Sequence, residues 1–338
     1  MKVGVLTGGG DCPGLNPAIR GIVFRAIDYG DEVIGFEEGW NGLLEGKTMK
    51  LSLNDVDQII GQGGTILFTS RTNPFKVERG PERILENLHK FSIDALVAIG
   101  GDDTLGVALR LSKLGVHVVG VPKTMDNDLS GSDFTFGFDT SVEVAVDALT
   151  RLRDTAKSHK RIIVLEVMGR EAGWVALYTG IAGGADWILV PEDNIDFDAM
   201  CKHLKKDFER KEYALVVVSE GINLPVEEQG EVDQFGHTLL RKRGVGDLIA
   251  DIIAEKTGIS TRSAAIGHIQ RGGPPSVFDR MLATRLGAKA IDMIHEEEFG
   301  KMSALKGNEI ITIPLEEATG QIKYVSKEWI EFMRIFLK

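Results

Sequence analysis

Short apolar runs alternate with longer amphipathic stretches along almost the whole chain. The runs predicted as strands cover 3–7, 32–36, 94–99, 116–121, 161–167, 186–190, 213–219 and 262–267. The stretches predicted as helices cover 14–29, 80–90, 104–114, 139–158, 172–182, 196–211, 237–256 and 276–298, with a C-terminal helix near 325–336. This alternation is typical of βαβ units joined into a parallel sheet. The chain is therefore expected to be an α/β protein.

Two of these runs, 95–99 and 214–218, are entirely apolar. Strands that helices cover on both faces have this composition. The length of 338 residues is enough for two domains, since domains of 100 to 200 residues are common. We expect a domain boundary near residue 138, where a glycine leads into the long helix, and we expect the chain to cross between the domains more than once.

The composition excludes several classes of function. The formal net charge is −11, whereas a nucleic-acid-binding protein needs a basic face. Cys12 and Cys201 are the only cysteines, too few for a disulfide framework or a four-cysteine zinc site. The first residues do not resemble a signal peptide, and no apolar run reaches membrane-spanning length. These features predict a cytoplasmic enzyme that binds neither nucleic acid nor membranes.

Three glycines follow the first predicted strand, in the sequence Thr7-Gly8-Gly9-Gly10-Asp11. Successive glycine amides can cradle a phosphate, and the N-terminus of the next helix adds partial positive charge. No Gly-Lys-Ser/Thr follows, so this turn is not the P-loop of nucleotide-binding proteins. A glycine-rich turn without any ligand is the alternative interpretation.

A second turn, Gly100-Gly101-Asp102-Asp103-Thr104, follows another buried-type strand. Asp102 could hold Mg²⁺ that bridges phosphate oxygens. Asp103 places a second carboxylate where a phosphate-bearing donor should approach, which indicates a small and highly anionic donor. Asp103 and Thr104 could instead be N-caps of the next helix. Lipid kinases and NAD kinases have a similar Gly-Gly-Asp turn, so this motif alone does not decide the function.

The segment 122–128, Pro-Lys-Thr-Met-Asp-Asn-Asp, is the most informative motif. Asp126 is a candidate general base that removes a proton from an attacking hydroxyl, and Asp128 could orient it or support the metal. Lys123 could offset the charge of an anionic donor. An Asx-rich surface turn is the alternative, but the motif follows a buried-type strand. We therefore expect phosphoryl transfer here.

Further polar residues follow other predicted strands. Arg170 could stabilise charge on a moving phosphoryl group, and Glu220 could accept hydrogen bonds from sugar hydroxyls. His268 and Arg271 are spaced to bind a terminal phosphate, and Arg71 is a weaker candidate for a phosphate contact. Ligands of open α/β sheets bind at the carboxyl ends of strands. We therefore expect these groups to share one site.

Taken together, the motifs resemble the phosphofructokinase family along nearly the whole chain, and they occur in the family's order. The resemblance implies two Rossmann-like lobes, each a mainly parallel sheet flanked by helices. The donor lobe is expected to comprise 1–138 and about 258–308, and the sugar-phosphate lobe 139–257 and about 309–338. The implied reaction is direct phosphoryl transfer to the 1-hydroxyl of fructose 6-phosphate.

The resemblance also implies roles for individual residues. Asp126 is the implied catalytic base and Asp102 the Mg²⁺-linked acid, while Gly10, Thr124 and Arg170 stabilise the moving phosphoryl group. Contacts with the sugar phosphate are implied for Thr124, Asp126, Asp128, Arg161, Met168, Gly169, Arg170, Glu220, Arg262, His268 and Arg271. Of these, Arg161 and Arg262 are expected to complete a neighbouring subunit's site, which implies a homodimer or homotetramer.

Two positions separate the donors used within this family. Bacterial users of ATP have glycine at positions 103 and 123, whereas users of pyrophosphate have Asp103 and Lys123, as in this chain. A carboxylate at 103 would repel the α-phosphate of ATP. The sequence therefore predicts pyrophosphate as donor, with Gly10, Arg71, Asp103 and Lys123 in its site. The alternatives are an ATP-dependent enzyme of the same fold, another Gly-Gly-Asp kinase, a non-catalytic sugar-phosphate sensor, and a longer acceptor such as sedoheptulose 7-phosphate.

Overall fold

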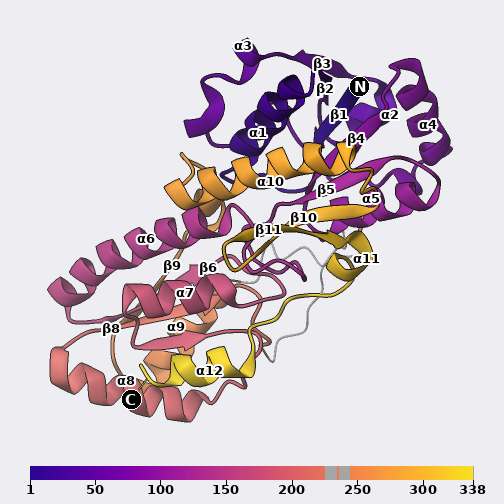
Figure 1. Ribbon diagram of the computed structural model, residues 1–338. Helices are drawn as coiled ribbons and strands as arrows, with labels where there is room; N and C mark the ends of the chain where they lie inside the picture. The colour runs from indigo at the N-terminus through magenta and orange to yellow at the C-terminus, as the bar shows by residue number, and fades with distance from the viewer. Residues whose placement is uncertain (225–233, 236–243, 338) are drawn as a thin grey trace.

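The computed structural model describes residues 1–224, 234–235 and 244–337 and consists of two lobes, each built on its own sheet (Figure 1). The first sheet has the order β11-β10-β5-β4-β1-β2-β3. Its strands are β1 (Lys2–Thr7), β2 (Glu32–Phe36), β3 (Thr48–Leu51), β4 (Ala95–Gly100), β5 (Val118–Pro122), β10 (Lys301–Lys306) and β11 (Glu309–Pro314). The pairs β2–β3 and β10–β11 are antiparallel, and the other pairs are parallel.

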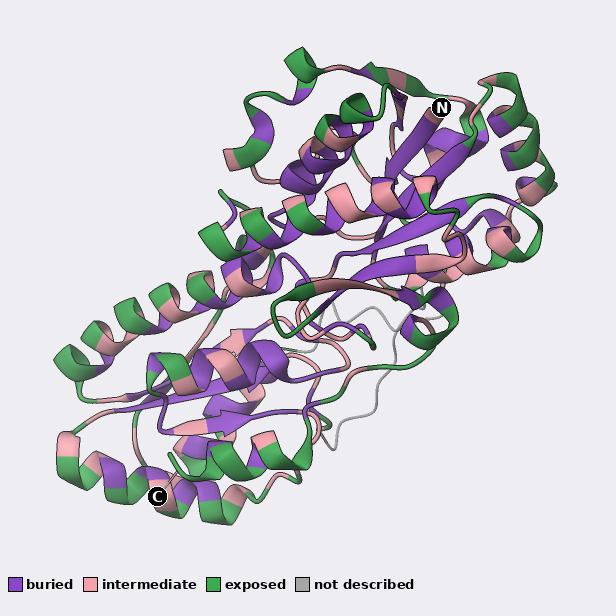
Figure 2. Ribbon diagram, in the orientation of Figure 1, coloured by how far each residue is buried: buried purple, intermediate pink, exposed green. Residues whose placement is uncertain are grey.

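Helices cover both faces of the first sheet. One face packs against α1 (Leu15–Asp28) and α10 (Val277–His295). The other face packs against α2 (Trp40–Glu45), α4 (Gly80–Lys90), α5 (Asp102–Lys113) and α11 (Leu315–Ala318). The short elements α3 (Leu53–Val56), η1 (Ile59–Gly61) and η2 (Pro74–Lys76) complete this lobe. Figure 2 shows the sheet buried between half-buried helices, as the apolar runs predict.

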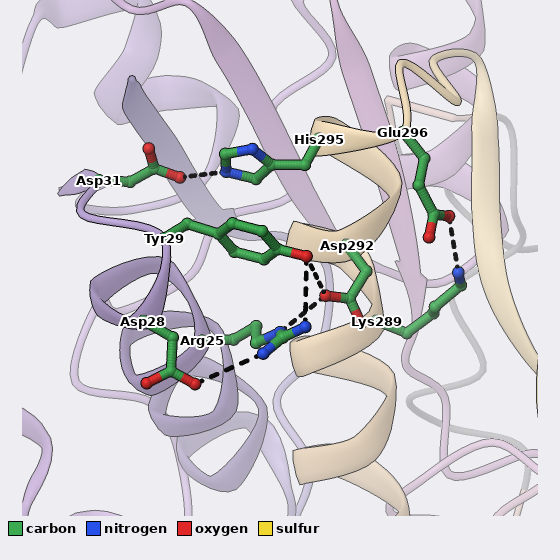
Figure 3. Close-up of polar contacts among 8 residues, drawn as sticks. All are labelled: Arg25, Asp28, Tyr29, Asp31, Lys289, Asp292, His295 and Glu296. Carbon is green, nitrogen blue, oxygen red and sulfur yellow. Dashed lines mark hydrogen bonds and ion pairs between the residues drawn. The ribbon is translucent and has the colours of Figure 1, made fainter.

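A polar cluster joins the C-terminal ends of α1 and α10 (Figure 3). The Arg25 guanidinium and the Tyr29 hydroxyl both donate hydrogen bonds to Asp292, at 2.7 and 3.1 Å. The Tyr29 ring stacks on His295 with 3.8 Å between ring centroids, and Nε2 of His295 lies 2.7 Å from the Asp31 carboxylate. Since α1 and α10 are about 250 residues apart in sequence, this cluster fixes a long-range helix pair.

The second sheet is parallel, with the order β7-β8-β6-β9. Its strands are β6 (Ile162–Val167), β7 (Trp187–Leu189), β8 (Ala214–Ser219) and β9 (Thr261–Ala265). One face packs against α6 (Phe138–His159), α7 (Trp174–Gly183) and α12 (Lys327–Arg334). The other face packs against α8 (Phe197–Lys211) and α9 (Val245–Thr257). The 3₁₀ helix η3 (Gly267–Arg271) follows β9.

The predicted α/β fold with two helix-flanked, mainly parallel sheets is confirmed. Every predicted strand is present with bounds within two residues of those expected, and β3, β10 and β11 were not predicted. The predicted helix 237–256 corresponds to α9, although residues 237–243 lie outside the described residues. None of the helices in the described part of the chain has the length and apolar composition needed to cross a bilayer.

The sheets correct two details of the expected lobe boundaries. Strand β9 pairs with β6 in the second sheet, although residues from about 258 were expected in the donor lobe. Strand β11 pairs with β10 in the first sheet, although residues from about 309 were expected in the sugar-phosphate lobe. The chain thus returns to the first lobe between β9 and α10, and leaves it again after α11. Parallel pairing across about a hundred residues has no local sequence signal, so the register of β9 could not be predicted.

Candidate active site

Three turns meet at the carboxyl ends of β1, β4 and β5, which are neighbouring strands of the first sheet. The amide of Gly8, directly after β1, donates to the Ile99 carbonyl at 2.9 Å, and the amide of Lys123 donates to the Gly100 carbonyl at 2.9 Å. These bonds place the glycine turn, the Gly-Gly-Asp-Asp turn and the segment 123–128 side by side, as the motif positions predict.

Two cations lie against the glycine turn. The buried ammonium of Lys123 donates a hydrogen bond to the Gly10 carbonyl, and burial lowers the pKa of this lysine. From the far end of the chain, Nη1 of Arg271 donates to the Asp11 carbonyl at 3.0 Å. A Cβ atom at position 10 would lie 2.7 Å from Arg271, so only glycine fits there without displacing the guanidinium. The Lys123 amine and the Arg271 guanidinium therefore both lie against this turn, where an anion could bind.

The two acids of the second turn occupy the first turn of α5. Asp102 is exposed, and its Oδ1 accepts a hydrogen bond from the amide of Gly320 at 2.8 Å. Asp103 is half-buried beside it. Neither serves as N-cap, because Gly101 holds that position. Within 1–224, 234–235 and 244–337, no three acidic, histidine or cysteine side chains form a metal-binding group. Asp102 alone could thus add one oxygen ligand to a metal that phosphates also hold.

Hydrogen bonds fix the shape of the segment 123–128. The Thr124 hydroxyl donates to Asp128 at 3.0 Å and accepts from the Asp126 amide at 3.1 Å. Asn127 has a φ of 53°, in the left-handed region, and its side-chain oxygen accepts from the Thr135 amide at 3.1 Å. One carboxylate oxygen of Asp126 is buried and has no hydrogen-bond partner among the residues that the structure describes. A buried polar atom without a partner calls for an explanation, and a substrate hydroxyl would supply one.

The carboxylates near Asp126 are electrostatically linked. Burial and, after it, the negative charge of Asp126 raise the pKa of Asp128 to about 7. Burial also raises the pKa of Glu220 to about 7, again with Asp126 as the next cause. Glu220 follows β8 in the second lobe, whereas Asp126 follows β5 in the first. Their coupling places the two lobes face to face at this site.

The second lobe presents the loop 168–173 after β6. The amide of Met168 donates to the side-chain oxygen of Gln270 at 2.8 Å, and Nε2 of Gln270 donates to Ser141 at 3.0 Å. A Cβ at Gly221 would lie only 2.0 Å from the Arg170 carbonyl, so glycine is required for this loop to pack against the end of β8. Met168, Gly169, Arg170 and Glu220 are therefore held together by backbone contacts.

The remaining predicted residues divide into two groups. His268 lies on η3 with Arg271, and Arg71 follows Ser70, whose carbonyl accepts from the Gly9 amide at 3.0 Å. Arg161 and Arg262 instead lie at the amino ends of β6 and β9. Six residues separate Arg161 from the end of β6, a span of about 20 Å, and three residues separate Arg262 from the end of β9, about 10 Å. Arg161 thus lies at the opposite end of its strand from the loop 168–173.

Two residues of this region were not predicted as functional. Gln270 lies within a motif that the sequence singles out, and its burial between Ser141 and Met168 could not be read from that motif. Lys323 belongs to the segment after α11, where no motif draws attention to it, yet its amide donates to the Asp128 carbonyl at 2.8 Å.

Known proteins resemble this chain over its full length. Residues 2–294 match the family described as phosphofructokinase. A pyrophosphate–fructose 6-phosphate 1-phosphotransferase of Dictyoglomus thermophilum is 52% identical, over 99% of this chain and 98% of that protein. An ATP-dependent 6-phosphofructokinase of Corynebacterium efficiens is 47% identical, over 99% of each.

A solved structure agrees with these sequence matches. The Pichia pastoris phosphofructokinase in the T-state superposes with a TM-score of 0.83 and 32% identity, over 94% of this chain and 35% of that one. Sequence match, fold and the ordered series of motifs at the strand ends agree, and the chain belongs to the phosphofructokinase family.

Proposed function

We propose that the protein transfers a phosphoryl group from pyrophosphate to the 1-hydroxyl of fructose 6-phosphate, giving fructose 1,6-bisphosphate and phosphate. The observation that carries this proposal is the segment 123–128. It holds a buried lysine against the glycine turn, and it presents a carboxylate oxygen of Asp126 without a hydrogen-bond partner among the described residues. The reaction is reversible, because pyrophosphate and the phosphorylated sugar are close in transfer potential.

Asp126 acts as the general base in this proposal. It accepts the proton of the sugar 1-hydroxyl as that oxygen attacks the terminal phosphorus of the donor, and inorganic phosphate leaves. Gly10, Thr124 and Arg170 stabilise the negative charge of the phosphoryl group during the transfer. In-line transfer depends mainly on positioning and charge stabilisation, which suits a rigid turn better than a mobile one.

The donor site lies between the glycine turn and the start of α5. Lys123 and Arg71 attract pyrophosphate, and the partial positive charge at the N-terminus of α5 favours an anion. Asp103 projects from the first turn of this helix, where its charge and volume oppose the α-phosphate of a nucleotide. The relative from Dictyoglomus thermophilum, named for pyrophosphate as donor, supports this choice.

Mg²⁺ is the proposed metal, with Asp102 as its protein ligand. Mg²⁺ is commonly held by one or two carboxylates together with substrate phosphates and water, which fits a site with a single exposed acid. When bound, the ion neutralises charge on the phosphates and aligns them with the acceptor. The amide of Gly320, 2.8 Å from Oδ1 of Asp102, orients the carboxylate.

The sugar phosphate lies against the second lobe in this proposal. Glu220 accepts hydrogen bonds from sugar hydroxyls, and Asp128 and the loop 168–170 bound the sugar near the reacting oxygen. His268 and Arg271 bind the 6-phosphate. Arg271 also contacts the Asp11 carbonyl, so it stands between the two phosphates and contributes charge to both.

We further propose a homo-oligomer, dimer or tetramer, in which Arg161 and Arg262 complete a neighbour's sugar-phosphate site. One nitrogen of Arg161, Nε, is buried without a hydrogen-bond partner in the described part of the chain. Arg262 is exposed on β9, which is an edge strand. In this proposal a second subunit packs against this edge, and both arginines reach into its sugar-phosphate site. The cytoplasmic location stays a prediction.

The deciding experiment measures fructose 1,6-bisphosphate formation from fructose 6-phosphate and Mg²⁺, with pyrophosphate and ATP tested in parallel. Turnover with pyrophosphate and not with ATP is the expected result. Turnover with ATP alone would contradict the role of Asp103 and favour the alternative, which the ATP-dependent relative supports. Sedoheptulose 7-phosphate tested as acceptor in the same assay measures how far the sugar pocket extends.

A further inference from the structure

The chain between α11 and α12 crosses from the first lobe to the second beside the proposed active site (Figure 1). We call residues 319–326 the C-terminal strap. Its contacts begin at Asp102, whose carboxylate accepts from the Gly320 amide. They continue along the end of the catalytic segment, where Ile322 forms an antiparallel bridge with Leu129 and the amide of Lys323 donates to the Asp128 carbonyl at 2.8 Å.

The strap is equally attached to the second lobe. The indole N–H of Trp174, at the start of α7, donates to the Lys323 carbonyl at 2.6 Å. The Val325 amide donates to Glu192 at 2.9 Å, and the same carboxylate accepts from the Gly173 amide at 3.0 Å. These residues adjoin the loop that carries Arg170. The strap thus contacts Asp102 and the end of the catalytic segment directly, and it is linked to the loop 168–173 through Glu192.

The side chain of Lys323 enters the protein behind the catalytic segment. Its ammonium donates to the side-chain oxygen of Asn127 at 2.9 Å, to the Ser132 carbonyl at 2.9 Å and to the Asp133 carbonyl at 3.1 Å. Three acceptors satisfy all three N–H groups of a protonated lysine. Burial lowers the pKa of Lys323 to about 8, while the carboxylates of Asp128 and Asp133 oppose that shift, so the group is charged at neutral pH.

Of these three hydrogen bonds, the one to Asn127 bears on the position of the catalytic segment. Asn127 has a φ of 53° and lies directly after Asp126. Non-glycine residues adopt this conformation at some cost, which neighbouring contacts must offset. The Asn127 side-chain oxygen receives hydrogen bonds from both the Thr135 amide and Lys323. Because Asn127 directly follows Asp126, a change in the Asn127 backbone would shift the turn that carries the Asp126 carboxylate.

We propose that Lys323 is a positioning residue for the transfer, which holds Asn127 in its left-handed conformation and so aims Asp126 at the acceptor hydroxyl. The inference rests on the proposed role of Asp126. A displacement of the reacting groups by about 1 Å can cost on the order of 100-fold in rate. Removal of Lys323 is therefore expected to lower kcat roughly 10- to 100-fold, with the KM of both substrates changed less than about threefold because no substrate-binding residue is lost.

Four variants test this role in the full-length protein, with pyrophosphate and fructose 6-phosphate as substrates. Lys323→Met removes the donors and the charge, and Lys323→Gln covers the case in which that variant does not fold. Lys327→Met removes an exposed lysine on α12 and is expected to leave kcat unchanged. Val325→Ala changes another residue of the strap and leaves a cavity in the hydrophobic core of the second lobe. It is expected to lower the unfolding midpoint and to leave kcat unchanged.

A double variant locates the effect. Asn127→Ala and Lys323→Met should each lower kcat, and the two losses should not multiply when combined, because both act on the same turn. The inference would be overturned if the two losses of kcat multiplied in the double variant. It would also be overturned if kcat of Lys323→Met stayed within threefold of wild type, or if Val325→Ala lost as much kcat as Lys323→Met. If the wild-type protein itself showed no turnover, the proposed function would be overturned. That failure is distinguishable from failure of the inference, because it is measured before any variant is made.

Discussion

The hydroxyl of Thr124 donates a hydrogen bond to the Asp128 carboxylate at a distance of 3.0 Å. The same hydroxyl accepts one from the Asp126 amide, so one threonine organises both acids of the segment. Asp128 therefore shapes the turn, and Asp126 keeps one oxygen without a protein partner in the described residues. This division supports the proposed role of Asp126 in proton transfer, with Asp128 shaping the turn around it.

Replacement of Asp126 tests the proposed base. Asp126→Ser should lower kcat by roughly 10²- to 10⁴-fold, the usual contribution of a general base, while the KM of fructose 6-phosphate changes little. Steady-state kinetics with pyrophosphate measures both constants. Asp251→Ser, which changes an exposed acid on α9, serves as the control and should retain wild-type kcat. Near-wild-type turnover in Asp126→Ser would remove this residue from its role.

The donor choice depends on Asp103 and Lys123 together. The double variant with glycine at both positions should lose much of its kcat/KM for pyrophosphate, because it removes the buried Lys123. Its discrimination against ATP should weaken, because it removes the carboxylate that opposes a nucleotide. Asp103→Asn keeps the volume and removes the charge, so it separates crowding from repulsion of an α-phosphate. Kinetics with pyrophosphate and ATP, alongside the unfolding midpoint of each variant, measures the change. An unchanged donor preference in the double variant would refute the account of both positions.

Glu220 should make sugar binding depend on pH. Its pKa is raised to about 7 by burial, so it is largely protonated at pH 6 and ionised at pH 8. The ionised carboxylate accepts hydrogen bonds from sugar hydroxyls more strongly than the protonated acid, one oxygen of which carries an O–H donor. The KM of fructose 6-phosphate should therefore fall as pH rises from 6 to 8, by up to about tenfold. In Glu220→Gln the part of the pH dependence that comes from Glu220 should disappear. The pH dependence that remains in this variant then measures titration of the sugar phosphate itself.

Much of this site follows from sequence because its residues come directly after strands. Asp102, Asp126 and Glu220 each follow a nearly all-apolar run, and the carboxyl ends of parallel strands meet at one edge. Lys323 and Gln270 could not be found in this way, because their roles depend on contacts with residues more than a hundred positions away. The pairing of β9 with β6 was missed for the same reason. Long-range register is set by packing, and no local pattern encodes it.

Asp279 gives a prediction about stability. It is fully buried at the start of α10, and its carboxylate accepts from both the amide and the hydroxyl of Thr140 at the start of α6. Burial raises its pKa to about 6. A raised folded-state pKa stabilises the protein below the unfolded-state pKa, and this stability is lost as pH rises through about 6.

Asp279→Asn keeps the acceptor and removes the titration. From pH 4 to pH 7 the wild type should lose up to about 3 kcal/mol of unfolding free energy relative to this variant. Urea unfolding of both proteins at the two pH values measures the difference. A difference that stays constant with pH would show that Asp279 has no raised pKa in the folded state.

Mixed oligomers test whether neighbouring subunits share a site. Arg262→Ala and Asp126→Ser should each be nearly inactive at low fructose 6-phosphate, because each lacks one component of every site. In a mixture refolded together, half of randomly formed dimers combine the two variants, and one of their two sites has both Asp126 and the neighbour's Arg262. About a quarter of wild-type activity should therefore return. Mixing without refolding is the control, and should give no recovery where subunits do not exchange. If the refolded mixture stays inactive, Arg262 acts within its own chain or not at all.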